Sequence, residues 1–153
     1  MRESLLPYAR HTIEEDDVAA VVESLRSGWL TTGPAGGRLE QAFAERVGTR
    51  FAIAFSSGTA ALHGCAFGAG LGPGDEAAVP TLTFAASAAC AVYVGARPVL
   101  ADVDPRTLNL DPAELERRIT PRTRAVVVVH YAGVPADMEA IGAIARRRGL
   151  LVI

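Results

Sequence analysis

The chain has 153 residues, half of them hydrophobic, which is enough to bury a sizeable core in one domain or in part of a larger one. Its formal net charge of −2 gives no basic face for nucleic acid, and no apolar run reaches membrane-spanning length. The first residues also lack the basic-then-apolar pattern of a signal peptide, so we expect a cytoplasmic protein.

The first fifty residues predict two helices joined by a loop. Thr12 and Glu15 form a T-x-x-E capping box, after which valine and leucine recur at helical spacing until Gly28. Residues 29–37 are rich in Thr, Gly and Pro, and a second apolar helical pattern then runs to Gly48. We therefore treat residues 1–50 as an N-terminal helical segment that carries a loop.

From residue 51 onward, short strands alternate with helices. The predicted strands are 51–55, 76–79, 98–101, 125–129 and 150–153, and the predicted helices are 60–68, 84–94, 112–119 and 138–148. Several strands are continuous apolar runs, which is typical of strands buried on both faces of a parallel sheet. We expect an α/β fold over residues 51–153, with a mostly parallel sheet in a three-layer α/β/α arrangement.

The last predicted strand ends together with the sequence. In parallel sheets, ligand-binding groups lie just past the carboxyl ends of the strands. The sequence stops where the next such group is expected. We therefore expect a fragment of a longer protein.

The turn before helix 60–68 predicts an anion site. Ser57, Gly58 and Thr59 aim backbone N–H groups, two hydroxyls and a positive helix end at one point, which suits a phosphate. Gly58 lets the backbone approach the anion closely. The alternative is an ordinary strand-to-helix turn with a Ser/Thr cap. Because neither G-x-G-x-x-G nor a P-loop is present, a dinucleotide or ATP site is disfavoured.

Other candidate residues follow the carboxyl ends of predicted strands. Phe84 could stack on a planar ligand, although core packing is the commoner role of a lone Phe. The acidic residues of segment 102–111 suit turns and a helix cap better than a metal or acid–base pair, so we predict no metal site. His130 and Tyr131 follow strand 125–129, where either side chain could line a site.

Together these segments resemble the DegT/DnrJ/EryC1/StrS family of PLP-dependent sugar aminotransferases along almost the whole chain. The matching pieces are Gly28-Trp29-Leu30-Thr31-Thr32-Gly33-Pro34, Ser57-Gly58-Thr59-Ala60-Ala61-Leu62-His63, Gly72-Pro73-Gly74-Asp75-Glu76, Pro80-x-x-Thr83-Phe84, Gly95-Ala96-x-Pro98-Val99-x-x-Asp102-Val103-Asp104, Ile119-Thr120-Pro121-Arg122-Thr123 and His130-Tyr131-Ala132-Gly133-x-Pro135-x-Asp137-Met138. Each piece alone is a weak signal, whereas their order and spacing are specific.

The resemblance implies the first part of the large domain of a fold type I PLP enzyme. It assigns the phosphate of pyridoxal 5'-phosphate to Ser57, Gly58 and Thr59, and the pyridine ring to Phe84. The residues that it places on the substrate side are Trp29, Thr31, Thr32, Gly33, His130 and Tyr131. It also implies that strand 51–55 is separated in the sheet from the other four by strands supplied later in the chain.

No catalytic residue is assigned to this chain. All 15 basic residues are arginine, so no ε-amine can form a Schiff base, and the chain alone is expected to be inactive. The resemblance places the family's lysine, and the aspartate that pairs with the pyridinium nitrogen, further downstream.

For the complete protein, the resemblance implies ping-pong transfer of an amino group from glutamate to a keto nucleotide sugar, in a homodimer with shared active sites. The run His130-Tyr131-Ala132-Gly133 favours C4 amination, as in the UDP-4-amino-4-deoxy-L-arabinose aminotransferases, and leaves C3 open. The alternatives are a PLP- or PMP-dependent sugar dehydratase of the same family, with His in place of the catalytic Lys, and an inactive fragment or degenerate regulator.

Overall fold

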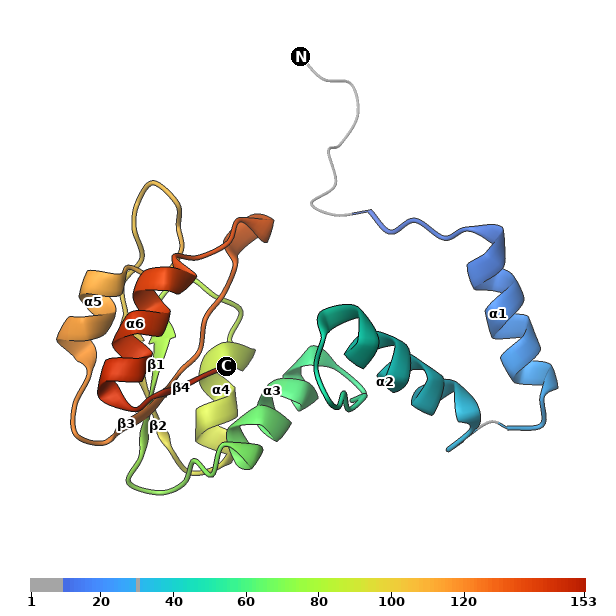
Figure 1. Cartoon of the computed structure of the whole chain (residues 1–153), viewed down its shortest axis with the longest axis horizontal. Helices are drawn as coiled ribbons and strands as arrows, with labels where there is room; N and C mark the ends of the chain where they lie inside the picture. Colours follow the sequence, from blue (N-terminus) through green and yellow to red (C-terminus); the bar gives the residue numbers. More distant parts are fainter. Residues whose placement is uncertain (1–9, 30) are drawn as a thin grey trace, which may run out of the picture. The chain divides into compact units, whose positions relative to one another are not determined.

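The computed structural model describes residues 10–29 and 31–153, and the chain divides into two compact units, Met1–Ala54 and Phe55–Ile153 (Figure 1). Each unit has its own set of elements. The first contains two helices, and the second contains a parallel sheet with helices packed on both of its faces.

The helices of the first unit are α1 (Glu15–Arg26) and α2 (Pro34–Val47). The predicted capping box at Thr12 is wrong, because α1 takes Glu14 as its N-cap and the Glu14 N–H donates to Asp17 Oδ2 at 2.9 Å. Acidic residues fill the first turn of α1, where they suit the positive helix end. Gly48, in the left-handed conformation, ends α2 as the sequence predicts, whereas α2 begins at Pro34, inside the predicted loop 29–37, because proline suits the first position of a helix.

The predicted strand over residues 51–55 does not form. Phe51 and Ile53 are both 72% exposed, and the Ala54 N–H donates to the Glu40 side chain at 2.8 Å. None of the described residues pairs with this segment as a neighbouring strand. A short apolar run favours an extended conformation, but a strand also needs a backbone partner, and the other four strands pair among themselves.

The sheet of the second unit is wholly parallel among its four strands. They are β1 (Glu76–Pro80), β2 (Arg97–Ala101), β3 (Thr123–Val126) and β4 (Leu151–Val152), in the order β2-β1-β3-β4. Strand β1 is buried along its whole length between β2 and β3. The predicted parallel sheet is confirmed, although β3 begins two residues earlier than expected and β4 is shorter.

Helices cover both faces of this sheet (Figure 1). They are α3 (Gly58–Gly68), α4 (Ala86–Tyr93), α5 (Pro112–Arg118) and α6 (Met138–Arg148). Ala77 and Val79 of β1 pack with residues of α3 and α4, whereas Ala78 packs with residues of α5 and α6. This alternation follows from the pleat of the strand, which points successive side chains to opposite faces. The predicted three-layer α/β/α arrangement is therefore confirmed.

Candidate functional site

The carboxyl ends of the parallel strands bring three candidate segments to one edge of the sheet. The Phe84 segment follows β1, the Asp102 segment follows β2, and the His130 segment follows β3. The first two are linked directly, since Thr81 Oγ1 donates to Asp102 Oδ1 at 3.0 Å. This edge is where open α/β sheets generally bind ligands.

The N-terminal ends of α3 and α4 face the same edge. Helix α3 leads into the amino end of β1 and α4 leads into the amino end of β2, so both helices run opposite to the strands. The two helices pack side by side (Figure 1). A helix N-terminus presents unpaired N–H groups and a partial positive charge, so this edge carries two positive helix ends.

The turn at the start of α3 has the features of an anion site. Ser57 is the N-cap, and its Oγ accepts a hydrogen bond from the Ala60 N–H at 3.2 Å. No described residue accepts a bond from the N–H of Gly58 or Thr59. A methyl group added at Gly58 would meet no atom within 4 Å, so the space beside these donors is open. Ser57 thus acts as an ordinary cap, while the two following N–H groups remain available for an anion.

Phe84 lies in the loop between β1 and α4 and is 78% exposed, so it does not pack in the core of this chain. The loop around it is ordered by its neighbours, because Thr83 Oγ1 and Ser87 Oγ lie 2.7 Å apart and the Ser87 N–H donates to the Phe84 carbonyl at 3.0 Å. The ring therefore stands on a fixed support at the carboxyl edge, where a planar ligand could stack on it.

His130 and Tyr131 lie in a loop that leaves the sheet after β3. The Nδ1 atom of His130 accepts a hydrogen bond from the Ala136 N–H at 3.1 Å, and the Tyr131 N–H donates to Asn109 Oδ1 at 2.8 Å. Asn109 is 4% exposed and comes from the loop after β2. The sequence of the Asn109 segment predicts turn and cap residues, and no local signal marks the bond of Asn109 to a residue 22 positions away.

The remaining predicted residues belong to the other compact unit. Trp29, Thr31, Thr32 and Gly33 lie in the loop between α1 and α2, and Leu30 of the same motif lies outside the described residues. Thr32 has a positive φ of 50°, and a Cβ at Gly33 would come within 2.8 Å of Trp29 Cβ. This loop therefore requires a glycine next to Trp29, and its role on the substrate side stays a prediction.

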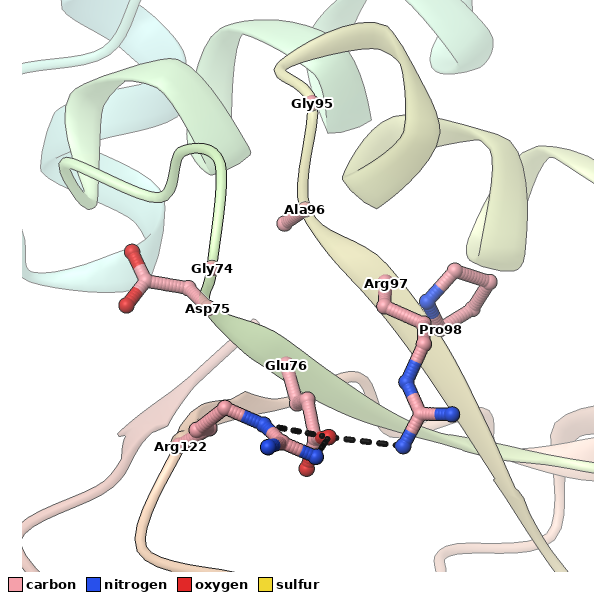
Figure 2. A pocket seen from close by; sticks show the side chains of 8 residues that line it. All are labelled: Gly74, Asp75, Glu76, Gly95, Ala96, Arg97, Pro98 and Arg122. Atoms are coloured by element: carbon pink, nitrogen blue, oxygen red, sulfur yellow. Dashed lines mark hydrogen bonds and ion pairs between the residues drawn. The ribbon is translucent and has the colours of Figure 1, made fainter.

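The amino edge of the sheet carries a different polar cluster (Figure 2). The Glu76 side chain is 1% exposed, and its Oε1 accepts bonds from Arg97 Nη2 at 2.7 Å and from Arg122 Nη2 at 2.8 Å, while Thr120 Oγ1 donates to Oε2 at 2.5 Å. The Thr120 hydroxyl first, and then the two guanidinium groups, lower the pKa of Glu76 to about 2, although burial opposes the shift. The cluster borders a cavity of 560 Å³.

The Glu76 cluster, formed by Glu76, Arg97, Thr120 and Arg122, links strands of the sheet to one another. Glu76 is the first residue of β1, Arg97 is the first residue of β2, and Arg122 immediately precedes β3. One carboxylate therefore ties together the amino ends of three adjacent strands, at the edge opposite the candidate site. No local sequence signal marks this set, because the partners of Glu76 lie 21 to 46 residues from it along the chain.

The structure describes residues 10–29 and 31–153, and two absences hold for this part of the chain. Within it, no three His, Cys, Asp or Glu residues gather where they could hold a metal ion. None of the helices in this part of the chain combines the length and the apolar character needed to cross a membrane.

Comparison with known proteins places this geometry in one family. A model of the DegT/DnrJ/EryC1/StrS aminotransferase family matches residues 11–153. The spore coat polysaccharide biosynthesis protein SpsC of Bacillus subtilis (strain 168) is 45% identical over 152 residues, which are 99% of this chain and 39% of SpsC.

Solved structures agree with this match. The aminotransferase from Psychrobacter cryohalolentis aligns with a TM-score of 0.88 at 36% identity, over 95% of this chain and 38% of that one. The PLP form of Spr1654 from Streptococcus pneumoniae, described as a sugar aminotransferase, aligns with a TM-score of 0.88 at 33% identity, over 97% and 38%. The chain thus spans about two fifths of the length of these relatives. The aminotransferase names do not favour the dehydratase alternative.

Proposed function

Because the chain belongs to the DegT/DnrJ/EryC1/StrS aminotransferase family, we propose that the complete protein is a PLP-dependent sugar aminotransferase. The chain covers 39% of SpsC, so the activity is that of a longer polypeptide. The observation that carries the cofactor part of this proposal is the open turn at the start of α3, with its two unpaired N–H groups.

The residues of this chain fit pyridoxal 5'-phosphate by their chemistry. The N–H groups of Gly58 and Thr59 and the hydroxyl of Thr59 would hold the phosphate at a positive helix end. The exposed ring of Phe84, at the same edge of the sheet, would stack on the pyridine ring. When bound, the cofactor supplies the electron sink that allows an amino group to leave one substrate and join another.

The protein part of the mechanism in this chain is binding and orientation. Fixing the phosphate and the ring face holds the cofactor in one orientation at the carboxyl edge, which lowers the entropic cost of meeting each substrate. The chain contains no lysine, so the amine that moves protons in this proposal comes from the remainder of the protein.

We propose glutamate as the amino donor and a keto nucleotide sugar as the acceptor. Support comes from the family match and from SpsC, whose name refers to polysaccharide biosynthesis. Amination at C4 is favoured by the run His130-Tyr131-Ala132-Gly133, whose aromatic side chain at the sheet edge could limit how deeply the sugar enters. A homodimer with shared active sites belongs to the same proposal. Analytical ultracentrifugation of the complete protein, which measures the mass of the assembly, tests the dimer.

The test is to purify the complete protein with pyridoxal phosphate and to record its visible absorbance. Glutamate should abolish the pyridoxal absorbance and release 2-oxoglutarate, and a 4-keto nucleotide sugar should then restore the absorbance. Failure to retain the cofactor would overturn the proposal. Preference for a 3-keto sugar would overturn only the C4 assignment. The 153-residue chain, tested alongside, should show no amino transfer because it has no lysine.

A further inference from the structure

Asn109 is a buried polar side chain with an unusual set of partners. It lies in the loop between β2 and α5, where Val103 and Leu110 form an isolated antiparallel bridge. Its backbone carbonyl accepts from the Asp104 N–H at 2.9 Å, and the preceding residue, Leu108, has a positive φ of 61°. The backbone on both sides of Asn109 is therefore held, and its side chain has a defined direction.

The carboxamide of Asn109 uses all of its donors within the loop after β3. Oδ1 accepts from the Tyr131 N–H at 2.8 Å, and Nδ2 donates to the carbonyls of Val134 at 3.1 Å and Pro135 at 3.3 Å. The two N–H bonds of the amide and one of its acceptor sites are thus occupied. These hydrogen bonds hold both ends of the segment 131–135.

Besides Asn109, this loop is held by two turn bonds, from the Gly133 N–H to the His130 carbonyl at 3.1 Å and from the Val134 N–H to the Tyr131 carbonyl at 3.0 Å, and by Ala136, which is buried against α5 and α6. Its only regular element is the short 3₁₀ helix η1 (Tyr131–Gly133), which buries none of its residues. Ala132 within it has φ 51° and ψ 27°, a left-handed conformation that costs free energy for a residue other than glycine. The bond between the Ala136 N–H and His130 Nδ1 closes the base of the loop. Of these contacts, those of the Asn109 amide are the ones that tie both ends of the strained turn to a different loop.

We propose that Asn109 is a positioning residue, which fixes the 130–136 loop and thereby sets the place of Tyr131 against the acceptor sugar. This proposal rests on the proposed function for the acceptor, whereas the fixing of the loop rests on the hydrogen bonds alone. An aspartate of equal size would keep the acceptor for the Tyr131 N–H but would turn a carboxylate oxygen toward two carbonyls. The site therefore requires an amide rather than a polar group of any kind.

The experiment compares N109D with Q41E in the complete protein. Gln41 is the only glutamine of the chain and lies exposed on α2 of the other compact unit, where its Nε2 donates to Glu45 Oε1 at 3.0 Å, so Q41E makes the same amide-to-carboxylate change in a different unit from the loop. Amide hydrogen exchange of residues 130–136, read by mass spectrometry, should become on the order of tenfold faster in N109D and stay unchanged in Q41E. The KM for the keto nucleotide sugar should rise about fivefold, with the KM for glutamate unchanged.

The outcomes distinguish a failure of the loop-fixing role of Asn109 from a failure of the proposed amino transfer. Exchange in N109D equal to that in Q41E would overturn the proposal, and so would faster exchange with an unchanged acceptor KM. If N109D does not fold, hydrogen exchange and KM are measured in N109S instead. Serine is uncharged and has one hydroxyl in place of the amide, so it removes most of the hydrogen bonds of Asn109 without adding a charge. If the unsubstituted protein transfers no amino group, the proposed function fails, and the exchange comparison still decides whether Asn109 fixes the loop.

Discussion

Replacing Glu76 by glutamine should destabilise the protein more than removing an exposed carboxylate with the same kind of partners. Glu76 is 1% exposed and holds Arg97, Arg122 and Thr120 at the amino ends of three strands. Glutamine keeps the shape but removes the charge and turns an NH₂ group toward one of its donors. The two guanidinium groups then lose their shared counter-charge.

The magnitude follows from the pKa of Glu76, which the fold lowers from 4.5 to about 2. A difference of this size corresponds to about 3 kcal/mol between the two protonation states. The side chains of Arg97 and Arg122 are 67% and 63% exposed, so solvent screening reduces the effect, and we expect a loss of about 1–2 kcal/mol. For a chain of this size, that loss lowers the unfolding temperature by roughly 3–8 °C.

The sign of the pH dependence is set by the same shift. A carboxyl whose pKa is lower in the folded state stabilises the fold above its unfolded pKa of 4.5, and this contribution is lost as the pH falls toward about 2. The difference in unfolding temperature between the unsubstituted protein and E76Q should therefore be full at pH 6 and should shrink as the pH falls from 5 to 2.

The matched control is E116Q. Glu116 also binds two arginines, since its Oε1 lies 2.7 Å from Arg147 Nη2 and 3.4 Å from Arg148 Nη2, but its side chain is 41% exposed. Thermal unfolding followed by circular dichroism at pH 6 should show a clearly smaller change for E116Q than for E76Q. Equal unfolding temperatures for the two variants, or an E76Q difference that persists at pH 2, would refute the reasoning.

Two further predictions concern the cofactor. Gly58→Val should weaken retention of pyridoxal phosphate with little change in unfolding temperature, because a Cβ at Gly58 would enter open space, where the phosphate is proposed to bind. Gly68→Val, at the other end of α3 and also beside open space, should leave retention unchanged. Tight retention with an unaltered visible spectrum in the Gly58 variant would contradict the phosphate assignment. Phe84→Ala should lower cofactor affinity by up to about tenfold in a spectroscopic titration, because the lost interaction is ring stacking. Since Phe84 is 78% exposed, the unfolding temperature of the variant should equal that of the unsubstituted protein. If the variant is instead largely unfolded, and its folded molecules bind the cofactor with normal affinity, the core-packing interpretation is right.

The elements that the sequence predicted correctly are those with local determinants. Helix α5 follows Asp111, whose Oδ1 accepts from the Ala113 N–H at 2.8 Å, and α6 follows Asp137, whose Oδ1 accepts from the Ala140 N–H at 2.9 Å. Both caps lie two or three residues from the groups that they satisfy, so the pattern is complete within one turn. The continuous apolar runs of the strands likewise indicated a parallel sheet covered on both faces.

The local geometry of the turn before α3 was also predictable from the sequence, whereas its role in binding a cofactor stays a prediction. The Ser57-Gly58-Thr59 turn could be recognised because the cap, the glycine and the helix start are adjacent in sequence. The exposure of Phe84 could not be decided in this way, since a lone aromatic after a strand suits both a core and a ligand contact.

The sequence by itself determined the helices, the caps of α5 and α6, the four paired strands and the Ser57-Gly58-Thr59 turn at the start of α3, because each depends on residues a few positions apart. Only the tertiary structure decided that segment 51–55 does not form a strand without a partner, that Glu76 binds Thr120 and Arg122 from 44 and 46 residues away, and that Asn109 binds the loop of Tyr131. A strand needs a neighbour and a buried polar group needs a partner, and which residues supply them is settled by the packing of distant elements.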